Sequence, residues 1–159
     1  MSGAPGVAAA SVLVHGTCVA VDGEGVLLLG PPGAGKSDLA LRLIDGGARL
    51  VADDQTALSR DGGEGDGGGI RAAAPPSIAG LLEIRGVGIV EVPSVAAAPL
   101  RLAVELVPDE AQVERLPEAR RWPCLGIDVP LLVLTPFPAS TPAKIRAALR
   151  ALASQPLAY

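Results

Sequence analysis

The stretch VLLLGPPGAGKSDLA, residues 26–40, decides the fold. Its continuous apolar run predicts a strand that is buried on both faces. The residues from Gly30 to Ser37 then satisfy the pattern G-x-x-x-x-G-K-[ST]. In this pattern the backbone N–H groups of a loop converge on phosphates, the lysine reaches the β- and γ-oxygens, and the serine hydroxyl holds Mg²⁺. The sequence therefore predicts a strand, a phosphate-binding loop and a helix, in that order.

The predicted helix begins at Lys36 and runs to about Asp45, where Gly46 and Gly47 end it. A chain with 20 glycines produces glycine-rich turns by chance, but chance does not supply a buried strand before the turn and a helix after it. We expect the whole loop to bind a nucleotide. Its residues are Gly30, Pro31, Pro32, Gly33, Ala34, Gly35, Lys36 and Ser37.

Further strands are expected on both sides of this unit. Two short β-rich runs, SVLVHG and TCVAVDG, precede it, and the turn at residues 22–25 makes a hairpin that leads into the loop. ARLVADD follows the helix as a strand, and residues 61–69 read as a flexible surface loop. LLEIRGVGIVEV, LRLAVELVP and PLLVL are strand-like, and residues 142–153 have helical spacing.

About seven strands and two helices predict an α/β domain that is rich in strand. Residues 1–10 read as a flexible tail, and residues 11–155 as one catalytic domain. Only 2% of the residues are aromatic, so the core must consist of small aliphatic side chains.

The composition also bounds the function. A net charge of −4 disfavours broad contacts with nucleic acid or an anionic membrane, and we expect neither partner. Cys18 and Cys124 have no metal-binding spacing and indicate reduced thiols in a cytoplasmic protein. Of the two lysines in the chain, Lys36 lies in the loop, where a compact ammonium group is useful.

Two consecutive acidic residues follow the strand after the helix. We expect Asp53 and Asp54 to emerge at the sheet edge that carries the loop. A phosphoryl transferase needs an acid that orients the metal and a group that accepts a proton from the attacking hydroxyl. An adjacent pair can divide these roles, and the alternative is a solvated acidic turn or a helix cap.

Two other classes of phosphate-binding protein match poorly. GTPases read their base with N-K-x-D, which is absent, and the D-x-x-G at residues 66–69 lies in a glycine-rich segment. Small-metabolite kinases usually close an arginine-bearing lid over the phosphates. The arginines of this chain are scattered, and no compact lid stands out.

Four segments in order, His15-Gly16, GPPGAGKSD, RLVADD and LLEIRGVGIVEV, resemble the catalytic domain of the HPr kinase/phosphorylase family over roughly residues 11–150. That family modifies a serine of the phosphocarrier protein HPr. The resemblance implies a P-loop-containing, strand-rich nucleotide-binding fold of the HPr kinase and PEP carboxykinase type. It also implies ATP and Mg²⁺ as cofactors, an HPr-like carrier as the protein partner, and a homo-oligomer, which is a hexamer in the family.

The same resemblance implies residue roles. Lys36 and Ser37 would contact phosphate and metal, and Asp54 would be the general base, or the acid in the reverse reaction. Glu83 would be a second Mg²⁺ ligand beside Ser37, and His15 and Arg115 would be further catalytic residues. With Asp53 as the metal-orienting member of the acidic pair, the expected metal ligands are Ser37, Asp53 and Glu83.

Each of the less specific assignments has a structural alternative. His15 is the only histidine and could satisfy a turn at a strand end. Glu83 alternates with apolar neighbours and could belong to a solvated strand face. Arg115 lies in the charged stretch DEAQVERLPEARR, where a surface helix or loop is the default.

Two departures from the family pattern affect the expected activity. The catalytic segments begin near residue 11, as in forms without the family's additional N-terminal domain. TPFPAST, residues 135–141, replaces a basic loop of P-x-R-P-G-R-N type, with Phe137 and Ser140 at the arginine positions. Because two bidentate phosphate donors are lost, the phosphorylase reaction and the usual hexamer are both in question.

The sequence thus predicts an ATP- and Mg²⁺-dependent protein-serine kinase of the phosphotransferase system that acts on an HPr-like carrier. Pyrophosphate is the alternative phosphate donor. One alternative function is a P-loop phosphotransferase with another acceptor. The second is a regulatory module that senses nucleotide without turnover, although such a module would not need the proton acceptor Asp54.

Overall fold

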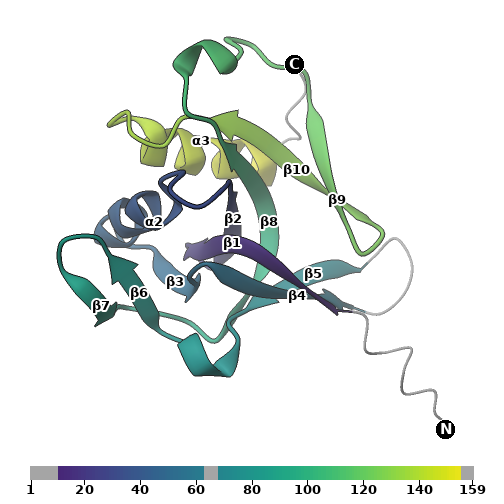
Figure 1. The fold of residues 1–159 in the computed structure, drawn as a ribbon. Coiled ribbons are helices and arrows are strands. Elements are labelled where there is room, and N and C mark those ends of the chain that lie inside the picture. The colour runs from purple at the N-terminus through teal and green to yellow at the C-terminus, as the bar shows by residue number, and fades with distance from the viewer. Residues whose placement is uncertain (1–10, 63–67, 155–159) are drawn as a thin grey trace, which may run out of the picture.

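The computed structural model describes residues 11–62 and 68–154, which form a strand-rich α/β fold (Figure 1). The predicted tail, residues 1–10, and residues 63–67 of the predicted loop lie outside the described residues. The strands are β1 (Ser11–Val21), β2 (Glu24–Leu29), β3 (Arg49–Ala52), β4 (Gln55–Asp61), β5 (Gly69–Ala73), β6 (Leu81–Ile84), β7 (Gly88–Glu91), β8 (Ala97–Leu106), β9 (Arg120–Cys124) and β10 (Ile127–Leu134). The α-helices are α2 (Lys36–Asp45) and α3 (Thr141–Ser154), with short 3₁₀ turns at Pro76–Ile78 and Glu110–Gln112.

Five strands pair in a closed circuit. β2 pairs with β1, β1 with β4, β4 with β5 and β5 with β8, all antiparallel, and β8 returns to β2 in parallel. β10 and β9 extend the sheet beyond β8, and β3 pairs with β1. β6 and β7 form a separate two-stranded hairpin.

The second half of β1, from Gly16 to Val21, and most of β2 are buried on both faces, and alternate residues there enter two different cores. Cys18 and Leu27 belong to the core inside the circuit. Val19 and Leu28, one residue further along the same strands, belong to the core that faces the helices. The inner core consists largely of Ala, Val, Leu and Cys, which agrees with the near absence of aromatic residues. Burial raises the pKa of the Cys18 thiol to about 12 and also raises that of Cys124.

Both α-helices cover one side of the sheet (Figure 1). Leu39 and Leu43 of α2 and Ile145 of α3 are completely buried in the core on that side. α2 ends where predicted, because the N–H groups of Gly46 and Gly47 bond to carbonyls of its last turn. The hairpin of β6 and β7 packs beside α2 through Leu82, which is also completely buried.

Several sequence expectations need correction. The runs SVLVHG and TCVAVDG form one strand, because Gly16 marks a close approach and no break. A Cβ there would lie 3.0 Å from the carbonyl oxygen of Leu28. At Gly16, β1 also changes its partner from β4 to β2. The count of about seven strands was too low, since β4, β5 and β9 were not foreseen as strands.

In the described part of the chain, no helix is both long and apolar enough to cross a membrane.

Candidate active site

The glycine-rich loop, residues 30–35, connects β2 to α2 at one edge of the sheet. Its backbone turns on itself, since the N–H of Ala34 donates to Pro31 O across 3.0 Å. Gly35 then caps α2 with a left-handed φ of 99° and accepts a bond from the N–H of Leu39. Glycine adopts this backbone conformation without strain, so the loop can place several N–H groups near the positive end of the helix.

Lys36 folds back over the loop that precedes it. Its Nζ donates to Gly30 O at 2.6 Å and to Pro31 O at 3.0 Å, and the residue is only 8% exposed. A buried ammonium group needs partners, and these carbonyls supply them. The lysine charge is thereby held inside the loop.

Asp53 is the centre of the hydrogen bonds that join the loop to the neighbouring strands. Its Oδ1 accepts from Ser37 Oγ at 2.7 Å and from Thr17 Oγ1 at 3.1 Å. Its Oδ2 accepts from the backbone N–H of Glu83 at 3.1 Å. Three donors compensate the burial of this carboxylate, which is 8% exposed. The expectation that the acidic pair would reach the loop edge is confirmed for Asp53.

Asp54 has the opposite environment, because its side chain is exposed. Its backbone adopts a φ of 67°, which is uncommon for a residue with a side chain. The conformation is held from both ends. The N–H of Asp54 donates to Thr17 Oγ1 at 3.1 Å, and its carbonyl accepts from the N–H of Gly16 at 3.0 Å. The two aspartates therefore differ sharply, one buried and fully bonded and the other free to meet a ligand.

His15, Glu83 and Arg115, the other predicted site residues, differ in how they are connected to Asp53 and Asp54. His15 is exposed on β1, next to Gly16 and opposite Gln55 of β4, so it flanks Asp54. Glu83 reaches Asp53 through its backbone, while its side chain is exposed. Arg115 is exposed in the connection between β8 and β9, and no hydrogen bond or ion pair joins it to the loop within the ranges that the structure describes.

A second loop, residues 135–140, lies against the glycine-rich loop. A Cβ on Gly35 would lie 2.9 Å from Pro136 Cβ and 3.1 Å from Phe137 Cζ. Thr135 at the start of this loop bonds to the carboxylate of Glu110. The segment TPFPAST therefore belongs to the same site, although it comes from the opposite end of the chain.

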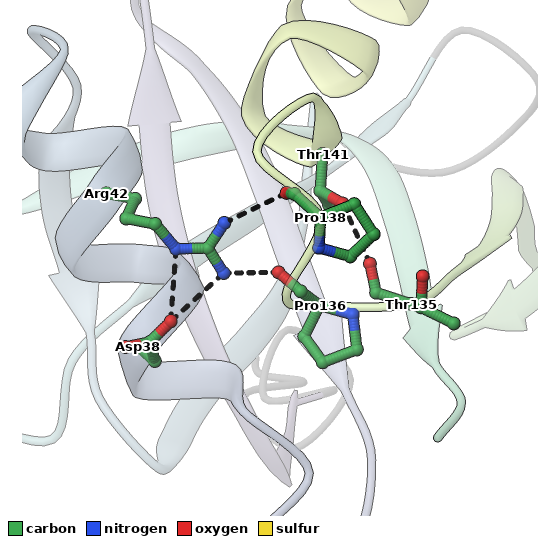
Figure 2. Close-up of polar contacts among 6 residues, drawn as sticks. All are labelled: Asp38, Arg42, Thr135, Pro136, Pro138 and Thr141. Atoms are coloured by element: carbon green, nitrogen blue, oxygen red, sulfur yellow. Dashed lines mark hydrogen bonds and ion pairs between the residues drawn. The ribbon is translucent and has the colours of Figure 1, made fainter. Parts of the chain in front are cut away.

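Arg42 clamps this second loop to α2 (Figure 2). Its guanidinium donates to Pro136 O, and to Pro138 O at 3.4 Å, while its Nε bonds to Asp38 at 3.0 Å. Thr141, at the start of α3, donates to Thr135 O at 2.8 Å. All of the clamped atoms on the loop are backbone carbonyls, so the side chain of Phe137 takes no part.

Sequence reasoning missed three residues of this region. Thr17 reads as an ordinary β-branched strand residue, and only its place one residue after Gly16 hinted at the site. Arg42 was not singled out, and the structure shows that it pairs with Asp38 at i,i+4 spacing and also reaches the second loop. The position of Phe137 against Gly35 had no local signal, because the two residues are a hundred positions apart.

The fold and the site define a strand-rich α/β domain in which a glycine-rich loop, a helix and an acidic pair meet at one sheet edge. The family model of the HPr serine kinase C-terminal domain matches residues 7–148. The chain therefore belongs to the HPr serine kinase C-terminal domain family.

Individual relatives agree with this assignment. The HPr kinase/phosphorylase of Peptoclostridium acidaminophilum is 40% identical over 133 residues, which are 82% of this chain and 41% of that protein. HPr kinase/phosphorylase 1 of Oceanobacillus iheyensis is 36% identical over 115 residues, 72% of this chain and 36% of that protein. The chain thus spans about two fifths of the length of these relatives.

A solved structure supports the same fold. The HPr(Ser) kinase/phosphatase from Coxiella burnetii superposes with a TM-score of 0.74 at 28% sequence identity. The match covers 90% of this chain and 91% of that one.

Proposed function

We propose that this chain is an ATP- and Mg²⁺-dependent protein-serine kinase that phosphorylates an HPr-like phosphocarrier of a phosphotransferase system in the cytoplasm. The observation that carries the proposal is the 2.7 Å bond from Ser37 to Asp53. This bond joins Ser37, which follows the loop lysine, to Asp53. The next residue, Asp54, has an exposed side chain that an incoming substrate can reach. The names of the relatives supply the acceptor, a serine of HPr.

Residues 30–37 would act as the P-loop, within a single catalytic domain at residues 11–155. The loop fits a phosphate ligand, because a Cβ at Gly33 would meet no atom within 4 Å and the φ of Gly33 is 83°. Backbone N–H groups in such a turn form a cradle for anions. Lys36 would exchange its bonds to Gly30 O and Pro31 O for bonds to phosphate oxygens.

The residues present also fit Mg²⁺. Ser37, Asp53 and Glu83 offer hydroxyl and carboxylate oxygens, the donors that Mg²⁺ prefers. Mg²⁺ is commonly held by one or two carboxylates together with substrate phosphates. No three His, Cys, Asp or Glu side chains gather into a metal site in the described ranges, so substrate phosphates would have to supply the further Mg²⁺ ligands. When bound, Mg²⁺ would neutralise charge on the phosphates.

The residues divide the reaction between them. Asp53 fixes the hydroxyl of Ser37 toward the loop and, through Thr17, fixes the backbone of Asp54. Asp54 Oδ would accept the proton of the attacking serine hydroxyl in the kinase direction and return it in the reverse direction. Its exposed side chain can meet a protein substrate without further opening of the fold.

Two supporting roles complete the proposal. We place His15 near the phosphates, because it flanks the Gly16 to Asp54 bond. Arg115 is proposed as the catalytic arginine, from a connection that leaves the same sheet end as the glycine-rich loop. The second loop, residues 135–140, contains no arginine or lysine, which favours the kinase reaction over phosphorolysis. A homo-oligomer is also proposed, and light scattering would measure its size.

Mass spectrometry of an HPr-like carrier after incubation with the protein and Mg-ATP tests the function. We expect one added phosphate on a serine, and its loss in Lys36→Ala. Lys144→Ala is the matched control, because Lys144 is the only other lysine and is exposed on α3. A carrier that stays unmodified while the wild-type protein binds ATP would contradict the proposed acceptor.

A further inference from the structure

The side chain of Phe137 is the only phenylalanine of the chain, and it is 66% exposed. Transfer of apolar surface from water to an apolar contact is favourable, so an aromatic ring left in solvent lacks a stabilising contact. Only 2% of the residues in the chain are aromatic, so few other side chains could supply an aromatic contact. Other apolar side chains of this chain are exposed as well, so the meaning of this exposure depends on where the ring lies.

The ring lies at the rim of the proposed P-loop. Phe137 Cζ would be 3.1 Å from a Cβ on Gly35, the residue that caps the N-terminus of α2. A nucleotide held by its phosphates in this loop must direct its ribose and base out over one side of the rim. Phe137 offers the aromatic face on that rim, and bases stack on such faces irrespective of their hydrogen-bonding edges.

The loop that carries the ring is rigid before any ligand arrives. Pro136 and Pro138 fix φ on both sides of Phe137, and the residue that precedes a proline is itself restricted to extended conformations. Arg42 holds the carbonyls of both prolines, as Figure 2 shows. A fixed ring loses little conformational freedom on binding, which favours its use as a platform.

We propose that Phe137 is a platform on which the base of the bound nucleotide stacks, an inference that rests on the nucleotide-binding function proposed above. The site thereby gains a subsite for the base, separate from the phosphate cradle of residues 30–37. The ligand class is a purine nucleoside triphosphate, since purines present the larger stacking surface. The phosphates alone would bind without using this subsite.

Isothermal titration calorimetry with Mg-ATP and with Mg-tripolyphosphate, which has no base, separates the two parts of the site. Phe137→Ala should weaken ATP binding roughly tenfold, as for other stacked bases. It should leave tripolyphosphate binding unchanged. Phe137→Trp should bind ATP about as tightly as the wild-type protein. Phe137→Leu, which is apolar but not aromatic, should bind ATP only slightly more tightly than Phe137→Ala.

Three other results of these titrations would contradict the base platform, and one of them would also contradict the nucleotide-binding function. Equal affinity of wild type and Phe137→Ala for ATP would overturn the platform and leave the kinase proposal intact. Equal weakening of ATP and tripolyphosphate would also overturn it, because the ring would then shape the loop only. If wild type bound neither ligand, the nucleotide-binding function itself would fail and the platform with it.

Discussion

Thr17 of β1 donates its hydroxyl hydrogen across 3.1 Å to Oδ1 of Asp53, the residue that follows β3. The same oxygen of Thr17 accepts the N–H of Asp54. One completely buried hydroxyl thus orients a buried carboxylate and holds the strained backbone of the proposed base. Thr17 therefore positions two residues of the proposed site, Asp53 and Asp54.

Thr17→Val should lower kcat for phosphate transfer while the KM for ATP changes little. Valine keeps the shape but removes the donor to Asp53 and the acceptor for Asp54, leaving buried polar groups unpaired at a cost of about 1–3 kcal/mol. Thr17→Ser should retain most of the turnover. Steady-state kinetics and urea unfolding measure both effects.

The control for Thr17 is Thr56→Val. Thr56 is equally buried, and its hydroxyl donates to Gly16 O at 2.9 Å, not to the carboxylate of an aspartate. Equal losses of kcat in the two variants would mean that Thr17 acts only through stability.

Asp54→Asn should reduce transfer by about 10²- to 10⁴-fold, the usual contribution of a general base. ATP binding should stay nearly intact, because the amide keeps the backbone bonds to Thr17 and Gly16. Quenched-flow transfer assays and calorimetry measure the two quantities. Asp22→Asn is a matched control, since Asp22 is also exposed with a positive φ of 52°, in the turn before β2. Parallel loss of binding and transfer at Asp54 would refute the assigned role.

Arg42→Lys should loosen the second loop, because an ammonium group cannot bridge two carbonyls as the planar guanidinium does. Hydrogen exchange at the amides of Phe137, Ala139 and Ser140 should become faster, and ATP affinity should fall several-fold. Arg146→Lys is the control, because the Arg146 guanidinium also donates to a main-chain carbonyl of α2, that of Leu43, and not to the second loop. Unchanged exchange at residues 137–140 would show that the prolines alone fix the loop.

Stability should fall with rising pH above the ordinary thiol pKa. Burial raises the pKa of Cys18 from 9.0 to about 12, so between these values the unfolded chain loses a proton that the folded chain keeps. Each pH unit in that interval should remove up to about 1.4 kcal/mol from the free energy of unfolding. Urea unfolding at pH 8, 9 and 10 measures the slope. Cys18→Ala should show a shallower slope, whatever its stability at pH 8, and an unchanged slope would assign it to other groups.

The local part of the fold was predictable from the sequence. The buried strand, the glycine-rich loop and α2 are encoded within about twenty consecutive residues, and the hydrophobic spacing and the glycines mark their limits. The placement of Asp53 followed from the short connection after α2. Contacts between residues far apart in sequence could not be predicted, because no local pattern encodes them. The strands β4, β5 and β9 were not predicted either, because they are short, polar on one side or interrupted by proline.

The candidate site was predictable in its residues more than in its contacts. The sequence predicted different roles for Asp53 and Asp54, and the fold adds their environments, since the carboxylate of Asp53 is buried with three donors and that of Asp54 is exposed. Glu83 was expected to contribute its carboxylate, whereas its backbone N–H makes the contact to Asp53. The roles of all predicted site residues in turnover stay predictions: His15, Lys36, Ser37, Asp53, Asp54, Glu83 and Arg115.

The attachment of the second loop through main-chain atoms has an evolutionary consequence. Arg42 and Thr141 grip carbonyl oxygens of Pro136, Pro138 and Thr135, which every amino acid supplies. Side chains along residues 137–140 can therefore diverge between lineages without detaching the segment from the helix. Substitutions in residues 137–140 can change what this segment offers to a ligand while its hydrogen bonds to Arg42 and Thr141 stay in place.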